Sequence, residues 1–181
     1  MSTANTDQDP ELREYRRGQF VISTDRRRLN LDAIHAFLAE CYWAKGIPQD
    51  VVARSIQHSL CFGLYNQGKQ IGFARVISDY ATYAYIGDVF VLDEYRGQGL
   101  GKWLMECVME YPWLQGLRRW SLLTRDAHGL YEHFGFRSLK APERWMEIDN
   151  PEVYVSADAR GRTGLSRSLA RVKAESESGN L

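Results

Sequence analysis

The sequence has few cysteines, and they lack the spacing of a metal site. Its 181 residues include three cysteines, Cys41, Cys61 and Cys107, each placed in an apolar segment far from the others. A disulfide framework needs an even set of cysteines, and a zinc site needs closely spaced pairs, so neither is expected. Buried, reduced thiols of a cytoplasmic protein are the interpretation that this pattern favours.

Net charge and long apolar runs are also absent. The 23 basic and 23 acidic side chains cancel to a formal net charge of zero, which argues against a nucleic-acid or membrane-surface binder. The opening segment MSTANTDQDP has no apolar signal core, and no apolar run approaches the ~18 residues of a membrane span. We therefore expect a cytoplasmic protein with neither nucleic-acid nor membrane partners.

The length fits one folded domain with polar ends. Residues 1 to 18 are expected to form a flexible arm, residues 19 to 155 the domain, and residues 156 to 181, which are small and charged, a flexible tail. Apolar periodicity and turn residues predict this order of elements: strand 20–23, a helix capped by Asn30, helix 51–60, hairpin 61–65 with 70–77, strand 82–92, a helix from 100, strand 120–124, helix 127–134 and strand 144–148.

The most informative stretch is a strand that passes through a glycine-rich turn into a helix. Val89 to Leu92 is an apolar strand, and Arg96-Gly97-Gln98-Gly99-Leu100-Gly101-Lys102 follows it. The next apolar residues recur with helical spacing and predict a helix packed on a sheet: Leu100, Trp103, Leu104, Cys107, Val108 and Tyr111. Glycines let a ligand approach the backbone, and the first amides of a helix attract anions. The junction therefore predicts a phosphate-binding loop.

The glycine spacing excludes the two commonest phosphate-binding loops. A Walker A loop would need a glycine where Arg96 stands and Ser or Thr where Trp103 stands. A dinucleotide-binding fingerprint would need its third small residue where Lys102 or Leu104 stands. The remaining pattern, Arg-x-x-Gly-x-Gly after a strand, resembles the pyrophosphate loop of the Gcn5-related N-acetyltransferases (GNAT).

A second signature of that family lies downstream. Residues 124–136 read TRDAHGLYEHFGF, in which Ala127 precedes Leu-Tyr-Glu and then Gly-Phe, similar to the family's helix along the cofactor. Thr124 stands where many members carry Asn. The resemblance covers about residues 20 to 150 and implies a mixed, mostly antiparallel, twisted sheet flanked by helices, an α/β fold of the α+β type.

The resemblance also implies how acetyl-CoA is held. Its pantetheine arm is expected to pair with strand 88–92, where a backbone N–H from Phe90 to Leu92 polarises the thioester, and its pyrophosphate is expected on the amides from Gly97 through Lys102. Arg96 and Lys102 would add positive charge. The resulting cofactor-binding set is Phe90, Val91, Leu92, Arg96, Gly97, Gln98, Gly99, Leu100, Gly101, Lys102, Thr124, Ala127 and Tyr131.

Two side chains are predicted to move protons. Tyr131 occupies the position of the family tyrosine that protonates the departing thiolate, and its alternative role is an aromatic packed on the cofactor. Asp88 begins the predicted acceptor strand and is a candidate general base, with a solvated or capping carboxylate as the alternative. Asp79, Tyr83 and Tyr85 are further candidates for the acceptor pocket. Arg26-Arg27-Arg28 marks either the acceptor entrance or a solvated loop.

The resemblance implies an acetyl-CoA-dependent N-acetyltransferase that acts by direct transfer in a ternary complex, because no cysteine lies in the signatures to carry the acetyl group. Its acceptor would be a small-molecule or peptide amine, and the aromatic residues from Tyr80 to Phe90 favour a small or aromatic one. A monomer or homodimer is expected. A non-catalytic acyl-CoA-binding module and an enzyme for longer acyl groups are the alternatives.

Overall fold

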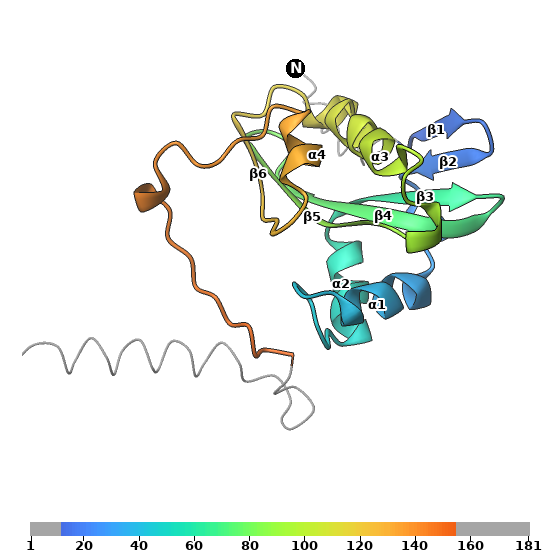
Figure 1. The fold of residues 1–181 in the computed structure, drawn as a ribbon, viewed down its shortest axis with the longest axis horizontal. Coiled ribbons are helices and arrows are strands. Elements are labelled where there is room, and N and C mark those ends of the chain that lie inside the picture. The colour runs from blue at the N-terminus through green and yellow to red at the C-terminus, as the bar shows by residue number, and fades with distance from the viewer. Residues whose placement is uncertain (1–11, 155–181) are drawn as a thin grey trace, which may run out of the picture.

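The computed structural model describes residues 12–154, and the predicted tail at 156–181 and most of the predicted arm lie outside the described residues. Within that part, six strands form one sheet in the order β1-β2-β3-β4-β5-β6 (Figure 1). The strands are β1 (Glu14–Arg17), β2 (Phe20–Ser23), β3 (Leu60–Asn66), β4 (Lys69–Ser78), β5 (Tyr83–Val91) and β6 (Arg119–Leu122).

Neighbouring strands are antiparallel throughout, except that β5 and β6 run parallel. The hairpins joining β3, β4 and β5 are short, whereas the return from β5 to β6 passes through a helix, as a parallel connection requires. The mixed, mostly antiparallel sheet expected from the sequence is confirmed.

Two helices cover each face of the sheet (Figure 1). One face carries α1 (Leu31–Glu40) and α2 (Gln49–Gln57), and the other carries α3 (Leu100–Met109) and the short α4 (His128–Glu132). Asn30 caps α1 as predicted, because its side-chain oxygen accepts a hydrogen bond from the Ala33 N–H at 3.0 Å.

The larger apolar core lies between the sheet and α3. Every residue of the predicted apolar stripe is at most 6% exposed, and all but Tyr111, which lies just beyond the helix, belong to α3: Leu100, Trp103, Leu104, Cys107, Val108 and Tyr111. These side chains join one buried cluster with strand residues such as Phe62 and Ile86. Burying such an apolar face supplies most of the stability of a helix of this length. The start of α3 is thereby held firmly against the end of β5.

A smaller core packs α1 and α2 on the opposite face, and it includes Ile34, Leu38, Val52, Phe73 and Phe90. The rings of Phe37 in α1 and Phe90 in β5 stack with centroids 3.8 Å apart and planes 13° apart. Stacked aromatic pairs add to the energy of area burial. This contact fixes α1 against the last residues of strand β5, next to the glycine loop.

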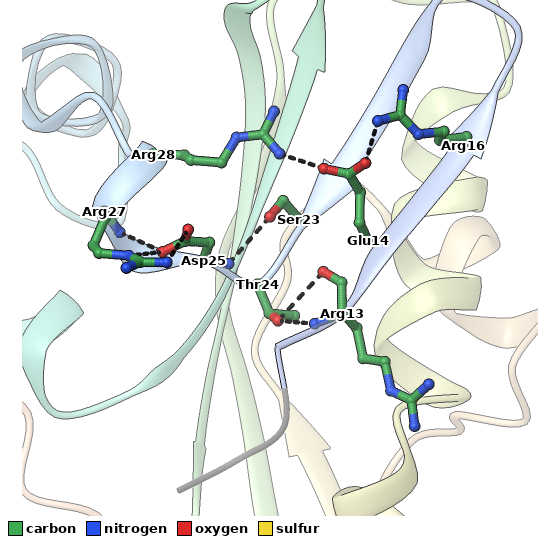
Figure 2. Close-up of polar contacts among 8 residues, drawn as sticks. All are labelled: Arg13, Glu14, Arg16, Ser23, Thr24, Asp25, Arg27 and Arg28. Atoms are coloured by element: carbon green, nitrogen blue, oxygen red, sulfur yellow. Dashed lines mark hydrogen bonds and ion pairs between the residues drawn. The ribbon is translucent and has the colours of Figure 1, made fainter.

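The predicted arm ends earlier than residue 18, because Glu14–Arg17 form β1 and pair with β2. Figure 2 shows how the start of this strand is held: the Thr24 hydroxyl oxygen accepts a hydrogen bond from the Arg13 N–H at 2.8 Å. Glu14 lies between Arg16 and Arg28 and pairs with both. The polar composition of the segment indicated a flexible arm. It forms a strand because its backbone pairs with β2.

The predicted strand at 144–148 is wrong. The chain makes a short 3-10 turn at Pro142–Arg144 and continues without regular structure to residue 150. A strand needs a neighbouring strand to satisfy its amides, and β6 is the last strand in the sheet order of the described residues. The segment instead places Trp145 beside β6, with the Arg119 guanidinium 5.2 Å from its ring centroid, and leaves Met146 96% exposed.

None of the helices formed by residues 12–154 combines the length and the apolar character needed to cross a membrane.

Candidate active site

A cavity of about 1330 Å³ opens where the second half of β5 meets the glycine loop and the approach to α4. The connection between α1 and α2 forms part of its other wall, with Phe37, Tyr42 and Trp43. The predicted site residues that line this cavity are Asp88, Phe90, Val91, Arg96, Gly97, Gly99, Leu100, Gly101, Thr124, Ala127 and Tyr131. Two segments more than twenty residues apart in sequence therefore meet at one site.

The two strands beneath the cavity separate. The parallel pairing of β5 with β6 runs from Tyr83 opposite Arg119 to Ile86 opposite Leu122 and stops there. From Gly87 onward, β5 keeps β4 as its only neighbour within the described sheet. Its other edge then presents unpaired backbone groups, which an extended ligand can bind as a strand would.

Backbone geometry singles out one amide on this open edge. The Leu92 N–H donates to the Ile71 carbonyl at 2.8 Å, so it faces β4 and is occupied. Successive residues of a strand face opposite edges, which turns the backbone of Val91 away from β4. The Arg96 Nε donates to the Val91 carbonyl at 3.1 Å from that open side. Among residues 90–92, Val91 therefore has the backbone N–H directed at the gap.

A bulge lies just before this point. The register of β4 against β5 shifts between Phe73 and Arg75, and Asp88 has a φ of 55°. A positive φ is uncommon for an aspartate and indicates a local constraint. The bulge re-aims the side chain of Asp88, which then lines the cavity.

The glycine loop keeps backbone accessible to the cavity. Gly97 and Gly99 have φ values of 76° and 73°, and a Cβ built on either would have no atom within 4 Å. Gly99 is the N-cap of α3, and no side chain caps the helix there. The first amides of α3 thus lack side-chain acceptors, and together with the helix dipole they provide a cradle for an anion.

Three predicted cofactor residues do not line the cavity. Gln98 and Lys102 have exposed side chains, and Leu92 is half-buried between the two apolar cores.

Tyr131 lies at the cavity wall and is 8% exposed. Burial raises the pKa of its phenol to about 12, and the neighbouring Tyr42, Tyr85 and Asp126 act in the same direction. The phenol therefore keeps its proton across the whole physiological range. Thr124 organises the turn before α4, because its hydroxyl oxygen accepts the Ala127 N–H at 3.0 Å.

Asp88 is not a free carboxylate. Its Oδ2 accepts a hydrogen bond from the Arg75 Nε at 2.6 Å, and both side chains are largely buried. Arg75 is held in turn by Ser59, whose hydroxyl oxygen accepts from its Nη1 at 3.2 Å. In the part of the chain that the structure describes, Oδ1 of Asp88 has no hydrogen-bond partner.

The other residues predicted for the acceptor pocket do not all lie at the cavity. Tyr85 lines the cavity, whereas Asp79 and Tyr83 do not. Asp79 closes the loop between β4 and β5, where three backbone N–H groups and the Thr82 hydroxyl donate to it and lower its pKa. Tyr83 hydrogen-bonds Ser121 across the β5–β6 pair. The arginines of 26–28 also lie outside this cavity; Arg27 pairs with Asp25, and Arg28 with Glu14 (Figure 2).

Two cavity features had no signal in the sequence. Arg75 gave no motif, and its place beside Asp88 depends on the register shift between β4 and β5. Tyr42 accepts the Arg125 N–H at 3.0 Å, a contact between residues 83 positions apart. Nothing local in either segment indicates these pairings.

Cys61 and Cys107 are buried as expected, whereas Cys41 is only partly buried. Burial raises the pKa of Cys41 to about 11 and that of Cys61 and Cys107 to about 12. A thiol must ionise to act as a nucleophile, so these three side chains are poorly suited to carry an acetyl group.

Comparison with known proteins assigns the fold and the family. A family model described as an acetyltransferase (GNAT) domain matches residues 57–138. Over 138 residues the chain is 35% identical to a proposed acetyltransferase of Gibberella zeae, covering 64% of this chain and 77% of that protein. Over 147 residues it is 27% identical to thialysine N-epsilon-acetyltransferase of Sus scrofa, covering 75% of this chain and 78% of that protein.

A solved structure agrees. The crystal structure of a proposed GNAT-family acetyltransferase from Xanthomonas campestris superposes with a TM-score of 0.73 at 54% identity, covering 75% of this chain and 96% of that one. The fold, the two sequence signatures and these relatives lead to one assignment: the chain belongs to the family of GNAT acetyltransferases.

Proposed function

We propose that the protein transfers the acetyl group of acetyl-CoA to a primary amine by direct attack in a ternary complex. The observation that carries this proposal is that the unpaired edge of β5, the uncapped start of α3 and the buried Tyr131 phenol all border one cavity. Backbone edge, anion cradle and proton donor are the three elements that binding and cleaving a CoA thioester needs.

The residues present fit acetyl-CoA. A Cβ at Gly97 or Gly99 would project into open space, so the loop leaves room for a pyrophosphate against its amides. The pantetheine arm would pair with the open edge of β5 beyond Ile86. The acetyl carbonyl would then accept a hydrogen bond from the Val91 N–H, which stabilises the negative charge that develops on its oxygen during attack.

The acceptor amine attacks as its neutral form, so a proton must leave its ammonium first. Oδ1 of Asp88 is the available oxygen of a carboxylate on the cavity wall, and we assign it to hold the ammonium and accept this proton. The amine nitrogen then bonds to the carbonyl carbon and becomes positively charged. The C–S bond breaks as the thiolate leaves, and the nitrogen loses its second proton, which restores the proton that Tyr131 gives to the thiolate.

Tyr131 is assigned to protonate the thiolate. Its pKa of about 12 lies roughly 3.5 units above that of an ordinary thiol, so proton transfer to the free thiolate that left a phenolate behind would cost about 5 kcal/mol. Return of the second proton of the amine nitrogen to Tyr131 removes that penalty, because a nitrogen that is becoming an amide is far more acidic than the phenol. The three weakly acidic cysteines support direct transfer over an acetyl-cysteine route.

The proposed class of acceptor, a primary amine, is taken from the acceptor that one relative is named for. Thialysine, the acceptor named for the Sus scrofa relative, carries a primary amine, and we extend that class to this chain. The test is to incubate purified protein with acetyl-CoA and a panel of small amines and peptides while following free thiol and acetylated product. Equal amounts of thiol and product support the proposal. Tight acetyl-CoA binding without any product would contradict it and favour a binding module.

A further inference from the structure

The floor of the cavity carries a fixed pair of opposite charges beside the proposed acetyl position. Arg75 and Asp88 are only 15% and 13% exposed, and their contact at 2.6 Å joins β4 to the bulge of β5. A buried ion pair is weak evidence for stability by itself, because desolvation offsets much of the attraction. The hydrogen-bonding atoms of Arg75 and Asp88 that the ion pair does not use are therefore candidates for contact with a ligand.

Each partner of this ion pair retains hydrogen-bonding capacity toward the cavity. Arg75 uses Nε for Asp88 and one N–H of Nη1 for Ser59, and among residues 12–154 its Nη2 donates to no acceptor. Asp88 uses Oδ2 and keeps Oδ1. Both side chains line the cavity, so a ligand that supplies an acceptor for Nη2 and a donor for Oδ1 would complete their hydrogen bonding.

Gly87 keeps the space next to Nη2 clear. A Cβ on Gly87 would come 3.7 Å from Arg75 Nη2 and 3.2 Å from the ring of Tyr85. The absence of a side chain at this position leaves the guanidinium edge uncovered between the β5 backbone and that ring.

We infer that the acceptor carries a carboxylate next to its amine, as an α-amino acid does, and that Arg75 is the residue that recognises this carboxylate. The inference rests on the proposed acetyl transfer and adds its substrate class. The acceptor ammonium binds Oδ1 of Asp88, and its carboxylate accepts from Nη2 of Arg75. The dipole of the acceptor would lie antiparallel to that of the Arg75–Asp88 pair, so each charge faces its opposite.

The same arrangement disfavours other amines. A simple monoamine satisfies Oδ1 and leaves the Arg75 Nη2 donors without an acceptor after water is displaced. A polyamine would in addition bring a second positive charge toward the guanidinium. Discrimination by an unpaired buried group is stronger than discrimination by shape alone.

The test compares acceptors that differ only in the carboxylate, with phenylalanine against phenethylamine and lysine against cadaverine. Thiol release by the full-length wild type should show kcat/KM at least about tenfold higher for the amino acid of each pair, the effect of one charge-assisted hydrogen bond. Equal or better reaction of the carboxylate-free amines would overturn the inference while leaving acetyl transfer intact. If none of the acceptors caused thiol release, both the inference and the proposed acetyl transfer would be overturned.

Variants assign the preference to the residue. Arg75→Gln should make the two members of each pair react equally, mainly through a higher KM for the amino acid. Arg75→Lys keeps a positive charge beside Asp88 and serves as the second variant if Arg75→Gln does not fold. It should reduce the preference for the amino acid without abolishing it. Arg54→Gln is the matched control, because Arg54 pairs with Asp50 on α2 and lies outside the cavity. A preference that survives in both Arg75 variants would contradict the inference.

Discussion

The phenol oxygen of Tyr42 accepts a hydrogen bond from the backbone N–H of Arg125 at 3.0 Å, and the Arg125 guanidinium lies 3.8 Å from the centroid of the same ring. This double contact joins the connection after α1 to the turn before α4. Both residues line the cavity, so the contact sets the relative position of two of its walls.

Replacing Tyr42 should therefore weaken ligand binding as well as stability. Tyr42→Ala loses one hydrogen bond and one cation–π contact, together about 1 to 2 kcal/mol at a half-exposed site. We expect acetyl-CoA to bind about tenfold more weakly by calorimetric titration, and Tyr42→Phe, which retains the ring, to lose less. Unchanged binding by Tyr42→Ala would show that the bridge does not shape the site.

Removing the Tyr131 hydroxyl should slow chemistry and spare binding. Tyr131→Phe keeps the buried ring and removes the proton, so kcat should fall by ~10²–10⁴-fold while the affinity for acetyl-CoA stays the same. The defect should appear at every pH, because a phenol with a pKa of about 12 stays protonated below that value.

The wild-type pH–rate profile supplies the matching check. Loss of the Tyr131 proton cannot cause a decline in activity between neutral pH and about pH 11, so any alkaline limb in that window belongs to another group and should persist in Tyr131→Phe. If the variant matched wild type in kcat with a confirmed amine acceptor, Tyr131 would be a packing residue only.

The close approach of β4 and β5 predicts a stability effect at Gly72. A Cβ there would lie 2.8 Å from the Phe90 carbonyl oxygen and 3.0 Å from Leu64. Gly72→Ala should destabilise the fold by about 1–3 kcal/mol, since overpacking forces backbone to shift. Gly129→Ala in α4, where a Cβ meets nothing within 4 Å, is the control and should be neutral or slightly stabilising. Urea unfolding of both variants measures the difference.

Local patterns predicted the parts of this molecule that local physics determines. The apolar stripe on α3 and the glycine turn that leads into this helix follow from residue type and spacing within one short segment. The antiparallel hairpins could likewise be predicted, because short turns leave few alternative pairings.

Long-range pairing was the part that the sequence could not predict. The Arg75–Asp88 contact depends on a register shift, and the Tyr42–Arg125 contact depends on the packing of two loops. The apolar residues at 144–148 favoured a strand, but this segment forms no ladder with β6, and its contact with that strand is made through side chains. β1 shows the converse, because a polar segment becomes a strand when β2 offers its edge.

The central claim is that the glycine loop binds acetyl-CoA, and a matched pair of glycine variants tests it most directly. Gly99 and Gly116 have φ values of 73° and 75°, and a Cβ on either would have no neighbour within 4 Å. Alanine should impose similar backbone strain at both positions, whereas only Gly99 lines the cavity.

The measurement is thermal and calorimetric titration of wild type, Gly99→Ala and Gly116→Ala with acetyl-CoA. At a hundredfold excess over the dissociation constant, ligand should stabilise wild type and Gly116→Ala by about 2.7 kcal/mol. Gly99→Ala should fold but lose most of this stabilisation, because its methyl group occupies phosphate space. Equal acetyl-CoA binding by all three proteins would contradict the account.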